Sequence, residues 1–256
     1  MDLSGKRVLV SNDDGYQAPG IAVLAEAMAA LGAEVWISAP RDEQSAAGHS
    51  LTIRRPLRII KQSDRVFAVD GTPTDAVLLG VLEVMKETPP DLMVSGINRG
   101  GNLGEDVTYS GTVAAAMEGT LLGIPSIAFS LVVADGAQPK WATARLAVER
   151  TFAHFAGLKL PPKVLLNVNI PDVAEDGLGG VELTRQGYRK IGSDIHRAFD
   201  PRGEAYYWIG AQREEDRYAE GTDLEAVGRG VLSVTPLGLD LTHEPTRDDL
   251  ARLGRA

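Results

Sequence analysis

The sequence predicts an α/β fold: a three-layer sandwich in which a mainly parallel sheet is covered by helices on both faces. In roughly the first half of the chain, short apolar runs alternate with apolar residues at helical spacing. Glycine and proline residues separate these stretches and mark their ends. Strands that alternate with helices form parallel sheets, and right-handed crossovers place the strand-to-helix loops along one edge. We therefore expect a ligand site at the carboxyl ends of the strands.

The expected elements follow in order along the chain. Residues 6–12 are mostly apolar and are followed by turn formers, which predicts a buried strand. Ile21, Leu24 and Met28 then recur at helical spacing, and Gly32 can end that helix. A long polar loop is expected between residues 40 and 74. Further strands are expected at 34–39, 91–97, 125–131 and 163–171, and further helices at 74–86, 112–122 and 141–155.

The second half of the chain is less regular than the first. Residues 185–230 are polar and rich in Gly, Arg and Tyr, so we expect hairpins or an excursion from the main body there. A late strand is expected at 231–237 and a frayed, charged end at 246–256. The sequence contains no internal repeat and no clear linker. Residues 1–256 are therefore expected to form one domain with a C-terminal hairpin extension.

The composition excludes several classes of function. The net charge is −9, whereas nucleic-acid-binding domains are basic, so duplex nucleic acid is not an expected partner. The lack of cysteine excludes disulfides, thiolate nucleophiles and iron–sulfur clusters. We find no signal peptide and no run of about 18 apolar residues, which predicts a cytoplasmic protein without a membrane partner.

Polar side chains gather where consecutive predicted strands end. The carboxyl ends of parallel strands meet at one edge of a sheet, so these side chains are expected to converge in space. The candidate site residues are Asp13, Asp14, Ser45, Asn98, Asn102, Ser110, Gly111 and Thr112.

The adjacent carboxylates of Asp13 and Asp14 are the first chemical signal. Like charges at this distance raise a pKa or recruit a cation. Together with serine and asparagine oxygens they form a ligand set made only of oxygen, which suits Mg²⁺, Mn²⁺ or Ca²⁺ better than zinc or copper. The alternative is structural: Asp13 caps a turn and Asp14 is solvated.

The segment Ser110-Gly111-Thr112 lies where a predicted helix begins. Free backbone N–H groups and the positive helix end favour a phosphate there, and both hydroxyls could donate to it. The alternative is an ordinary helix N-cap. The glycine-rich residues 96–104 match neither a Walker loop nor a dinucleotide fingerprint. Their alternatives are a flexible loop or a close backbone approach to a ligand, with Asn98 and Asn102 oriented by the turns.

Other polar residues have structural interpretations. His49 is the histidine nearest these clusters in the sequence. It is either a surface or packing residue or a residue that contacts substrate or water. Glu118 lies in mid-helix among alanines, where a paired or partly exposed carboxylate is expected. Asp223 precedes an apolar run, where Thr222 or Asp223 is expected to cap a helix. No serine lies in a nucleophile elbow.

Several segments, in the same order as in the family, resemble SurE proteins, and together they span most of the chain. The matching segments are LVSNDDGYQAPGI (9–21), SAPRDEQSAAGHSLT (38–52), GTPTDAV (71–77), SGINRGGNLGEDVTYSGTVAAAMEG (95–119), LNVNIP (166–171) and SVTPL (233–237).

This resemblance implies a Rossmann-like core and a nucleotidase that removes phosphate from 5′- or 3′-nucleotides; some family members also shorten polyphosphate. It implies one divalent metal, Mg²⁺ or Mn²⁺, held by Asp13, Asp14, Ser45 and Asn98. The chain departs from the family pattern at Ala46, where many relatives have glycine.

The resemblance also implies a homodimer or homotetramer assembled through an extended C-terminal part, which residues 185–230 could supply.

The resulting hypothesis is metal-assisted hydrolysis of nucleoside monophosphates. Asn102, Ser110 and Thr112 would hold phosphate oxygens, and one of the aspartates would act as base. An aspartyl-phosphate mechanism is disfavoured because enzymes that use it have Asp-x-Asp. The rivals from other classes are a nucleotide-binding regulatory module without turnover, and a glycosyltransferase or dehydrogenase on a similar sheet.

Overall fold

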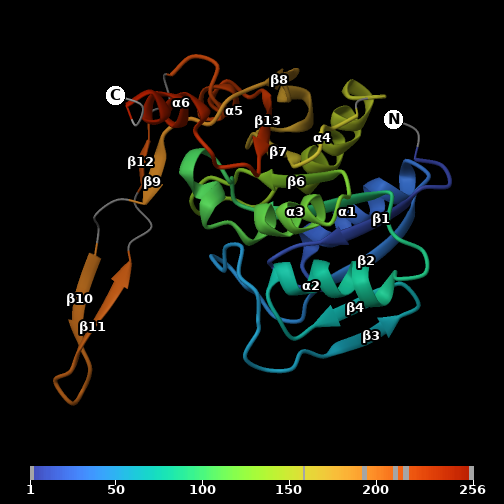
Figure 1. Ribbon diagram of the computed structural model, residues 1–256, viewed down its shortest axis with the longest axis horizontal. Helices are drawn as coiled ribbons and strands as arrows, with labels where there is room; N and C mark the ends of the chain where they lie inside the picture. Colours follow the sequence, from blue (N-terminus) through green and yellow to red (C-terminus); the bar gives the residue numbers. More distant parts are fainter. Residues whose placement is uncertain (1–2, 158, 192–194, 210–212, 216–218, 254–256) are drawn as a thin grey trace.

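The computed structural model describes residues 3–157, 159–191, 195–209, 213–215 and 219–253. Nine strands of this described part form one sheet in the order β3-β4-β2-β1-β5-β6-β7-β13-β8. They are β1 (Arg7–Ser11), β2 (Glu34–Pro40), β3 (Ile59–Ser63), β4 (Val66–Val69), β5 (Leu92–Arg99), β6 (Ser126–Leu131), β7 (Val164–Ile170), β8 (Val181–Leu183) and β13 (Leu232–Gly238). Every neighbouring pair from β4 to β7 is parallel, whereas β3 and β13 run antiparallel to β4 and β7. The expected mainly parallel sheet is confirmed (Figure 1).

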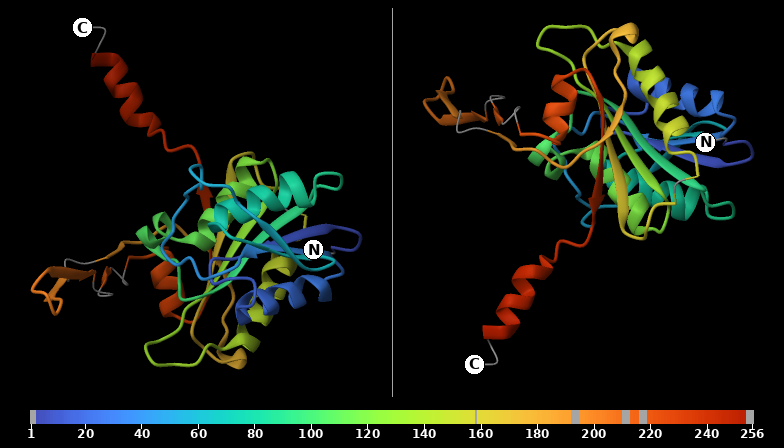
Figure 2. Two further views of the ribbon diagram at one scale, coloured as in Figure 1. Left: turned by 90° about the horizontal axis from the view of Figure 1, so that it is seen from below. Right: turned by 90° about the horizontal axis from the view of Figure 1, so that it is seen from above.

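Helices cover both faces of this sheet (Figure 2). Helices α1 (Pro19–Ala30) and α4 (Trp141–His154) pack together on one face, and α2 (Pro73–Leu79) and α3 (Gly111–Leu121) pack together on the other. Because side chains alternate along a strand, each central strand supplies both layers. The predicted three-layer α/β sandwich is therefore confirmed.

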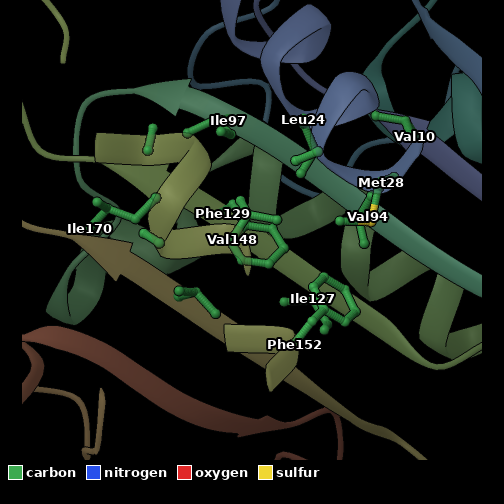
Figure 3. Close-up of a cluster of buried hydrophobic side chains, with 14 of the residues drawn as sticks. Val10, Leu24, Met28, Val94, Ile97, Ile127, Phe129, Val148, Phe152 and Ile170 are labelled. Atoms are coloured by element: carbon green, nitrogen blue, oxygen red, sulfur yellow. The ribbon is translucent and has the colours of Figure 1, made fainter. Parts of the chain in front are cut away.

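Alternate residues of the central strands pack into two separate hydrophobic clusters, one on each face of the sheet. In β1, Val8 and Val10 join the cluster under α1 and α4, whereas Leu9 joins the cluster under α2 and α3. Figure 3 shows the first cluster, in which Phe129 of β6 lies close to Phe152 of α4. Their ring centroids are 6.3 Å apart. This packing fixes the strands and leaves their carboxyl ends free to carry polar side chains.

The region expected as a polar loop between residues 40 and 74 contains the strands β3 and β4. All of β3 is exposed, and its sequence IIKQS lacks the strict alternation of a half-buried strand, so periodicity did not reveal it. The helix expected at 74–86 is also modified. It is α-helical only to Leu79 and continues as one wider turn, η1 (Gly80–Val84).

An arm projects from the body within the predicted excursion at 185–230 (Figure 1). We define the arm as the described residues of 189–215. Its base pairs β9 (Arg189–Ile191) with β12 (Arg213–Glu215), and its tip pairs β10 (Ile195–Phe199) with β11 (Ala205–Ile209). Helix α5 (Asp223–Gly228), by contrast, packs against β13 and β7 of the body.

The expectation of a frayed end at 246–256 is wrong for its described residues, because α6 (Glu244–Leu253) is a helix. Nδ1 of His243 accepts the backbone N–H of Thr246 at 3.3 Å, which satisfies one free donor of the first turn. Arg247 also pairs with Glu244 one turn earlier. Dense charge on this segment therefore marks an exposed helix, which projects away from the body (Figure 2). Among the described residues, no helix is both long enough and apolar enough to cross a bilayer.

Candidate active site

A pocket of about 770 Å³ opens at the carboxyl edge of the sheet. Its walls come from the ends of β1 and β5, the loop after β2, the short helix η2 (Gly104–Thr108) and the loop before α4. Pockets of this volume hold ligands the size of a nucleotide. The predicted residues that line it are Asp13, Asp14, Ser45, Asn98, Asn102 and Ser110.

Gly111 and Thr112 are not among the lining residues and instead lie behind Asp13. Thr112 is fully buried, and its hydroxyl donates a hydrogen bond to Oδ1 of Asp13. A Cβ atom on Gly111 would stand 2.7 Å from Cβ of Asp13, so a side chain at this position would displace the aspartate. The start of α3 thus supports Asp13 directly. That Thr112 contacts phosphate stays a prediction.

Burial raises the pKa of both aspartates. The pKa of Asp13 is raised because its carboxylate is desolvated, although the hydrogen bond from Thr112 opposes that rise. The pKa of Asp14 is raised to about 6, first by burial and then by the neighbouring charge of Asp13. The backbone N–H of Arg99 opposes this rise through a hydrogen bond of 3.4 Å to Oδ2 of Asp14. A pair of carboxylates in this state gains free energy from a cation placed beside it.

Two backbone hydrogen bonds hold the loop after β2, one to Asp13 and one to Tyr109. Gln44 N–H donates to the carbonyl of Asp13 at 2.8 Å, and Gly48 N–H donates to the carbonyl of Tyr109 at 3.1 Å. Within the loop, the hydroxyl of Ser45 donates to Oε1 of Glu43 at 2.8 Å. A donating hydroxyl keeps its oxygen lone pairs available for a metal ion.

Asn98 supplies the last predicted ligand. Its Nδ2 donates to the carbonyl of Gly100 at 2.8 Å, so the amide is oriented and its oxygen is the atom available for coordination. Asp13, Asp14, Ser45 and Asn98 thus form an all-oxygen donor set in one pocket. No group of three or more His, Cys, Asp or Glu residues suited to a metal occurs in the described part of the chain. The residues fit a hard cation that keeps water ligands better than they fit zinc.

The start of α3, which lies against Asp13, carries groups suited to an anion. Ser110 caps α3, because its hydroxyl oxygen accepts the backbone N–H of Val113 at 3.0 Å. The positive end of this helix therefore faces the pocket, an arrangement that favours phosphate. The expected cap at Ser110 is confirmed, whereas phosphate binding there stays a prediction.

A buried network holds Asn102 in place. Its Nδ2 donates to the hydroxyl of Ser130 at 2.7 Å, and its backbone N–H donates to Oδ1 of Asn169 at 2.9 Å. Its carbonyl accepts Nδ2 of Asn167 and of Asn169, at 2.9 and 3.0 Å. Asn167 and Asn169 of β7 thus hold Asn102 in the pocket lining. The sequence around Asn102 alone does not reveal these contacts.

Comparison with known proteins agrees with this geometry. The sequence profile described as "Survival protein SurE" matches residues 8–193, which is most of the chain. The chain belongs to the SurE family. A protein named 5′-nucleotidase SurE from Paramagnetospirillum magneticum is 58% identical to this chain over 255 residues, covering 100% of this chain and 97% of the relative. Its namesake from Rhodospirillum rubrum is 52% identical and covers 97% of this chain and 96% of its own.

A solved SurE structure extends the likeness to three dimensions. The crystal structure of the SurE protein from Aquifex aeolicus superposes with a TM-score of 0.83 at 43% sequence identity, covering 97% of this chain and 99% of the other. The SurE fold expected from the sequence motifs is therefore confirmed.

This SurE-family pocket also contains residues that the sequence did not single out. They are Glu43, Arg99, Asp106, Tyr109, Gln138 and Trp141. The first four lie close in sequence to predicted residues, so widening each motif would have found them. Gln138 lies in the loop after β6 and Trp141 begins α4. This segment carries no conspicuous polar cluster, and only the rule that strand-to-helix loops share one edge points to it.

His49 lies outside the lining of the pocket and pairs with Glu118 of α3. His49 Nε2 and Glu118 Oε2 are 2.9 Å apart, and Glu118 is buried. The expectation of a paired Glu118 is confirmed. The pair fastens the loop that carries Ser45 onto α3, which gives His49 a packing role in this fold.

Proposed function

We propose that this chain hydrolyses nucleoside 5′-monophosphates, and also 3′-monophosphates, to nucleoside and phosphate with the help of one divalent metal ion, Mg²⁺ or Mn²⁺. The observation that carries the proposal is the Asp13–Asp14 pair, buried and half-buried, at the edge of a nucleotide-sized pocket. The names of the relatives, 5′-nucleotidase SurE, supply the substrate class.

The proposed ligands of the metal are Asp13, Asp14, Ser45 and Asn98. When bound, such an ion neutralises charge that develops on phosphate and lowers the pKa of water. The proton of the attacking water passes to a carboxylate of the aspartate pair.

The phosphate side of the proposed site is built from neutral groups. The hydroxyl of Ser110 and the free backbone N–H groups at the start of α3 donate hydrogen bonds to phosphate oxygens, and the hydrogen-bonded Asn102 holds the neighbouring wall in place. Thr112 is assigned a supporting role because its hydroxyl is directed to Asp13. Arg99 is the single cationic side chain among the described lining residues, and we assign it to the outer part of a substrate anion.

Removal of terminal phosphate from polyphosphate is a further proposed activity. The pocket is open to solvent at a rim that carries Arg99, so an anion longer than a monophosphate can extend past the aspartates. Polyphosphate hydrolysis that is lost together with nucleotide hydrolysis in one variant would support a shared site.

The decisive test is phosphate release from a panel of nucleoside 5′- and 3′-monophosphates, first with EDTA and then with Mg²⁺ or Mn²⁺. We expect release that requires metal and falls at least a hundredfold in Asp14→Asn. Asp42→Asn is the matched control, because Asp42 lies in the next loop with an exposed side chain that pairs with Arg41. A folded protein that binds nucleotide but releases no phosphate with any metal would instead be a regulatory binding module.

We also propose that the chain works as a homodimer or homotetramer. The arm exposes aromatic and aliphatic side chains at Phe199, Tyr207, Trp208 and Ile209, the last 75% accessible. Large exposed apolar groups of this kind mark interaction surfaces. Sedimentation analysis of Trp208→Ser would show a smaller species than the parent protein if the arm joins subunits.

A further inference from the structure

Asp223 is a fully buried carboxylate that the proposed chemistry does not use. It lies at the start of α5, outside the lining of the pocket, and accepts three backbone N–H groups. Oδ2 accepts Gly104 N–H at 2.9 Å, while Oδ1 accepts Gly187 N–H at 2.8 Å and Leu224 N–H at 2.9 Å. One carboxylate thus ties together three segments of the chain.

Two of those segments have distinct functions in the fold. Gly104 begins η2, only two residues after Asn102 in the pocket lining. Gly187 lies just before β9, the strand that leads into the arm. The carboxylate of Asp223 therefore bridges the phosphate side of the candidate site and the base of the arm.

The backbones of these segments lie in direct contact. Gly104 has φ +52°, and a Cβ atom there would stand 2.8 Å from the backbone nitrogen of Arg189 and 2.9 Å from the carbonyl oxygen of Gly187. Gln186 adds a second tie, because its Nε2 donates to the carbonyl of Gly104 at 3.0 Å. The base of the arm is therefore packed directly against Gly104.

Capping of α5 does not explain the charge at Asp223. Thr222 already caps the helix, since its hydroxyl oxygen accepts the backbone N–H of Glu225 at 3.3 Å. Desolvation raises the pKa of Asp223, while the N–H groups of Gly104, Gly187 and Leu224 oppose that rise. A neutral residue would avoid this desolvation. The presence of a carboxylate is therefore explained by the hydrogen bonds that it accepts from Gly104 and Gly187.

We propose that Asp223 is a positioning residue for the phosphate side of the site, and that it couples the geometry of Asn102–Ser110 to the base of the arm. This proposal rests on the proposed function for its kinetic consequences, whereas its structural consequence is independent of activity. Asp223 touches neither substrate nor metal and acts through the Gly104 backbone.

The key variant is Asp223→Asn, which keeps the size of the side chain. The asparagine oxygen can still accept Gly187 and Leu224, but its amide nitrogen then faces the Gly104 N–H, so two donors meet. Thr222→Ala is the matched control, because it weakens the same helix by removing its cap without touching the link to Gly104.

With adenosine 5′-monophosphate as substrate, Asp223→Asn should lower kcat/KM by about ten- to a hundredfold, a usual range for residues that orient a site from behind. KM for substrate and the inhibition constant for inorganic phosphate should both rise. A reduced fraction of folded enzyme lowers kcat but leaves KM unchanged, so it cannot imitate this result. Thr222→Ala should keep the parent KM.

Hydrogen exchange separates this proposal from the proposed function. Amides of residues 102–110 should exchange faster in Asp223→Asn than in Thr222→Ala, whether or not the parent enzyme releases phosphate. Should Asp223→Asn fail to fold, Gln186→Ala tests the same link, because it removes only the exposed second tie to Gly104. We expect it to raise KM by about two- to fivefold, less than the loss of the carboxylate. Unchanged exchange at 102–110 in the folded variants, with parent KM, would overturn the proposal.

Discussion

The hydroxyl of Thr112 donates a hydrogen bond to Oδ1 of Asp13 and joins two residues that lie 99 positions apart in the sequence. Asp13 lies two residues after β1, and Thr112 lies in the first turn of α3, so the bond joins the edge of the sheet to a helix of the covering layer. It opposes the desolvation that raises the pKa of Asp13. The packing of α3 beside the end of β1 therefore affects the pKa of Asp13, a proposed metal ligand.

Replacing Thr112 by valine keeps the shape of the side chain but removes its hydroxyl. We expect kcat/KM to fall about ten- to a hundredfold, since the carboxylate loses the group that orients it. The free energy of unfolding should change by only about 1 kcal/mol, the value of one hydrogen bond. Thr112→Ser restores a donor and should recover most of the activity. A Thr112→Val enzyme with parent kcat/KM would show that Asp13 needs no such support.

Asp13→Asn should abolish most activity and leave the fold intact. Thr112 can still donate to the asparagine oxygen, and removal of a buried charge relieves desolvation, so the metal-free variant should be at least as stable as the parent. Thermal unfolding in EDTA and then with excess Mn²⁺ checks this. The parent Tm should rise with Mn²⁺, because ligands stabilise the state that they bind, and the variant Tm should not. Near-normal turnover by a folded Asp13→Asn enzyme would rule out the proposed ligand role.

Much of the site could be predicted because parallel strands end at one edge. Asp13 follows β1, Asn98 lies near the carboxyl end of the adjacent strand β5, and Ser110 caps the next α-helix, so topology alone brings these residues together. Ser45 followed from the same rule, applied to the loop after β2. Helix α1, which ends just before Gly32, was likewise visible in its apolar spacing, and β7 in the apolar residues of 163–171.

What sequence reasoning missed depends on contacts between distant segments. Asp223 reaches Gly104 across 119 positions, and the segment around it indicated only a helix cap. The exposed strand β3 has no buried face, so it has no apolar period to detect. Helix α6 was missed for the converse reason: its charges resemble those of a disordered tail, while pairs one turn apart support a helix.

The contacts of the Asp91 carboxylate lead us to expect a specific pH dependence of the free energy of unfolding. The backbone N–H of Arg7 donates to its Oδ2 at 2.9 Å and Lys6 faces its Oδ1 at 3.3 Å, and these contacts hold its pKa below the ordinary value of 3.8. A lowered folded-state pKa contributes stability that is present above the unfolded pKa and is lost as pH falls through the folded one.

The free energy of unfolding should therefore be lower in Asp91→Asn than in the parent by an amount that is constant from about pH 7 to 5 and shrinks below about pH 4. Because the carboxylate is partly exposed, we expect a loss of about 0.5–1 kcal/mol at neutral pH. Urea unfolding at several pH values measures it. Asp64→Asn is the control, since that side chain is fully exposed and pairs with Lys61 three residues away. A difference that grows towards pH 3 would have the wrong sign and would contradict this account of Asp91.

Ala46 lies in the pocket wall with φ 60°, a left-handed conformation in which a Cβ atom is strained by about 1–2 kcal/mol. It is also the position where many SurE relatives have glycine. Ala46→Gly should therefore raise the free energy of unfolding by up to about 1 kcal/mol, although glycine adds entropy to the unfolded chain.

Ala47→Gly separates the two effects, because Ala47 is not at positive φ and should lose about 0.4–1 kcal/mol by entropy alone. Opposite signs for these neighbouring alanines would locate strain at Ala46, next to the proposed ligand Ser45. Equal losses would mean that the loop relaxes around the methyl group. In that case the alanine would also leave the position of Ser45 undisturbed, and Mn²⁺ affinity should be the same in the parent and in Ala46→Gly.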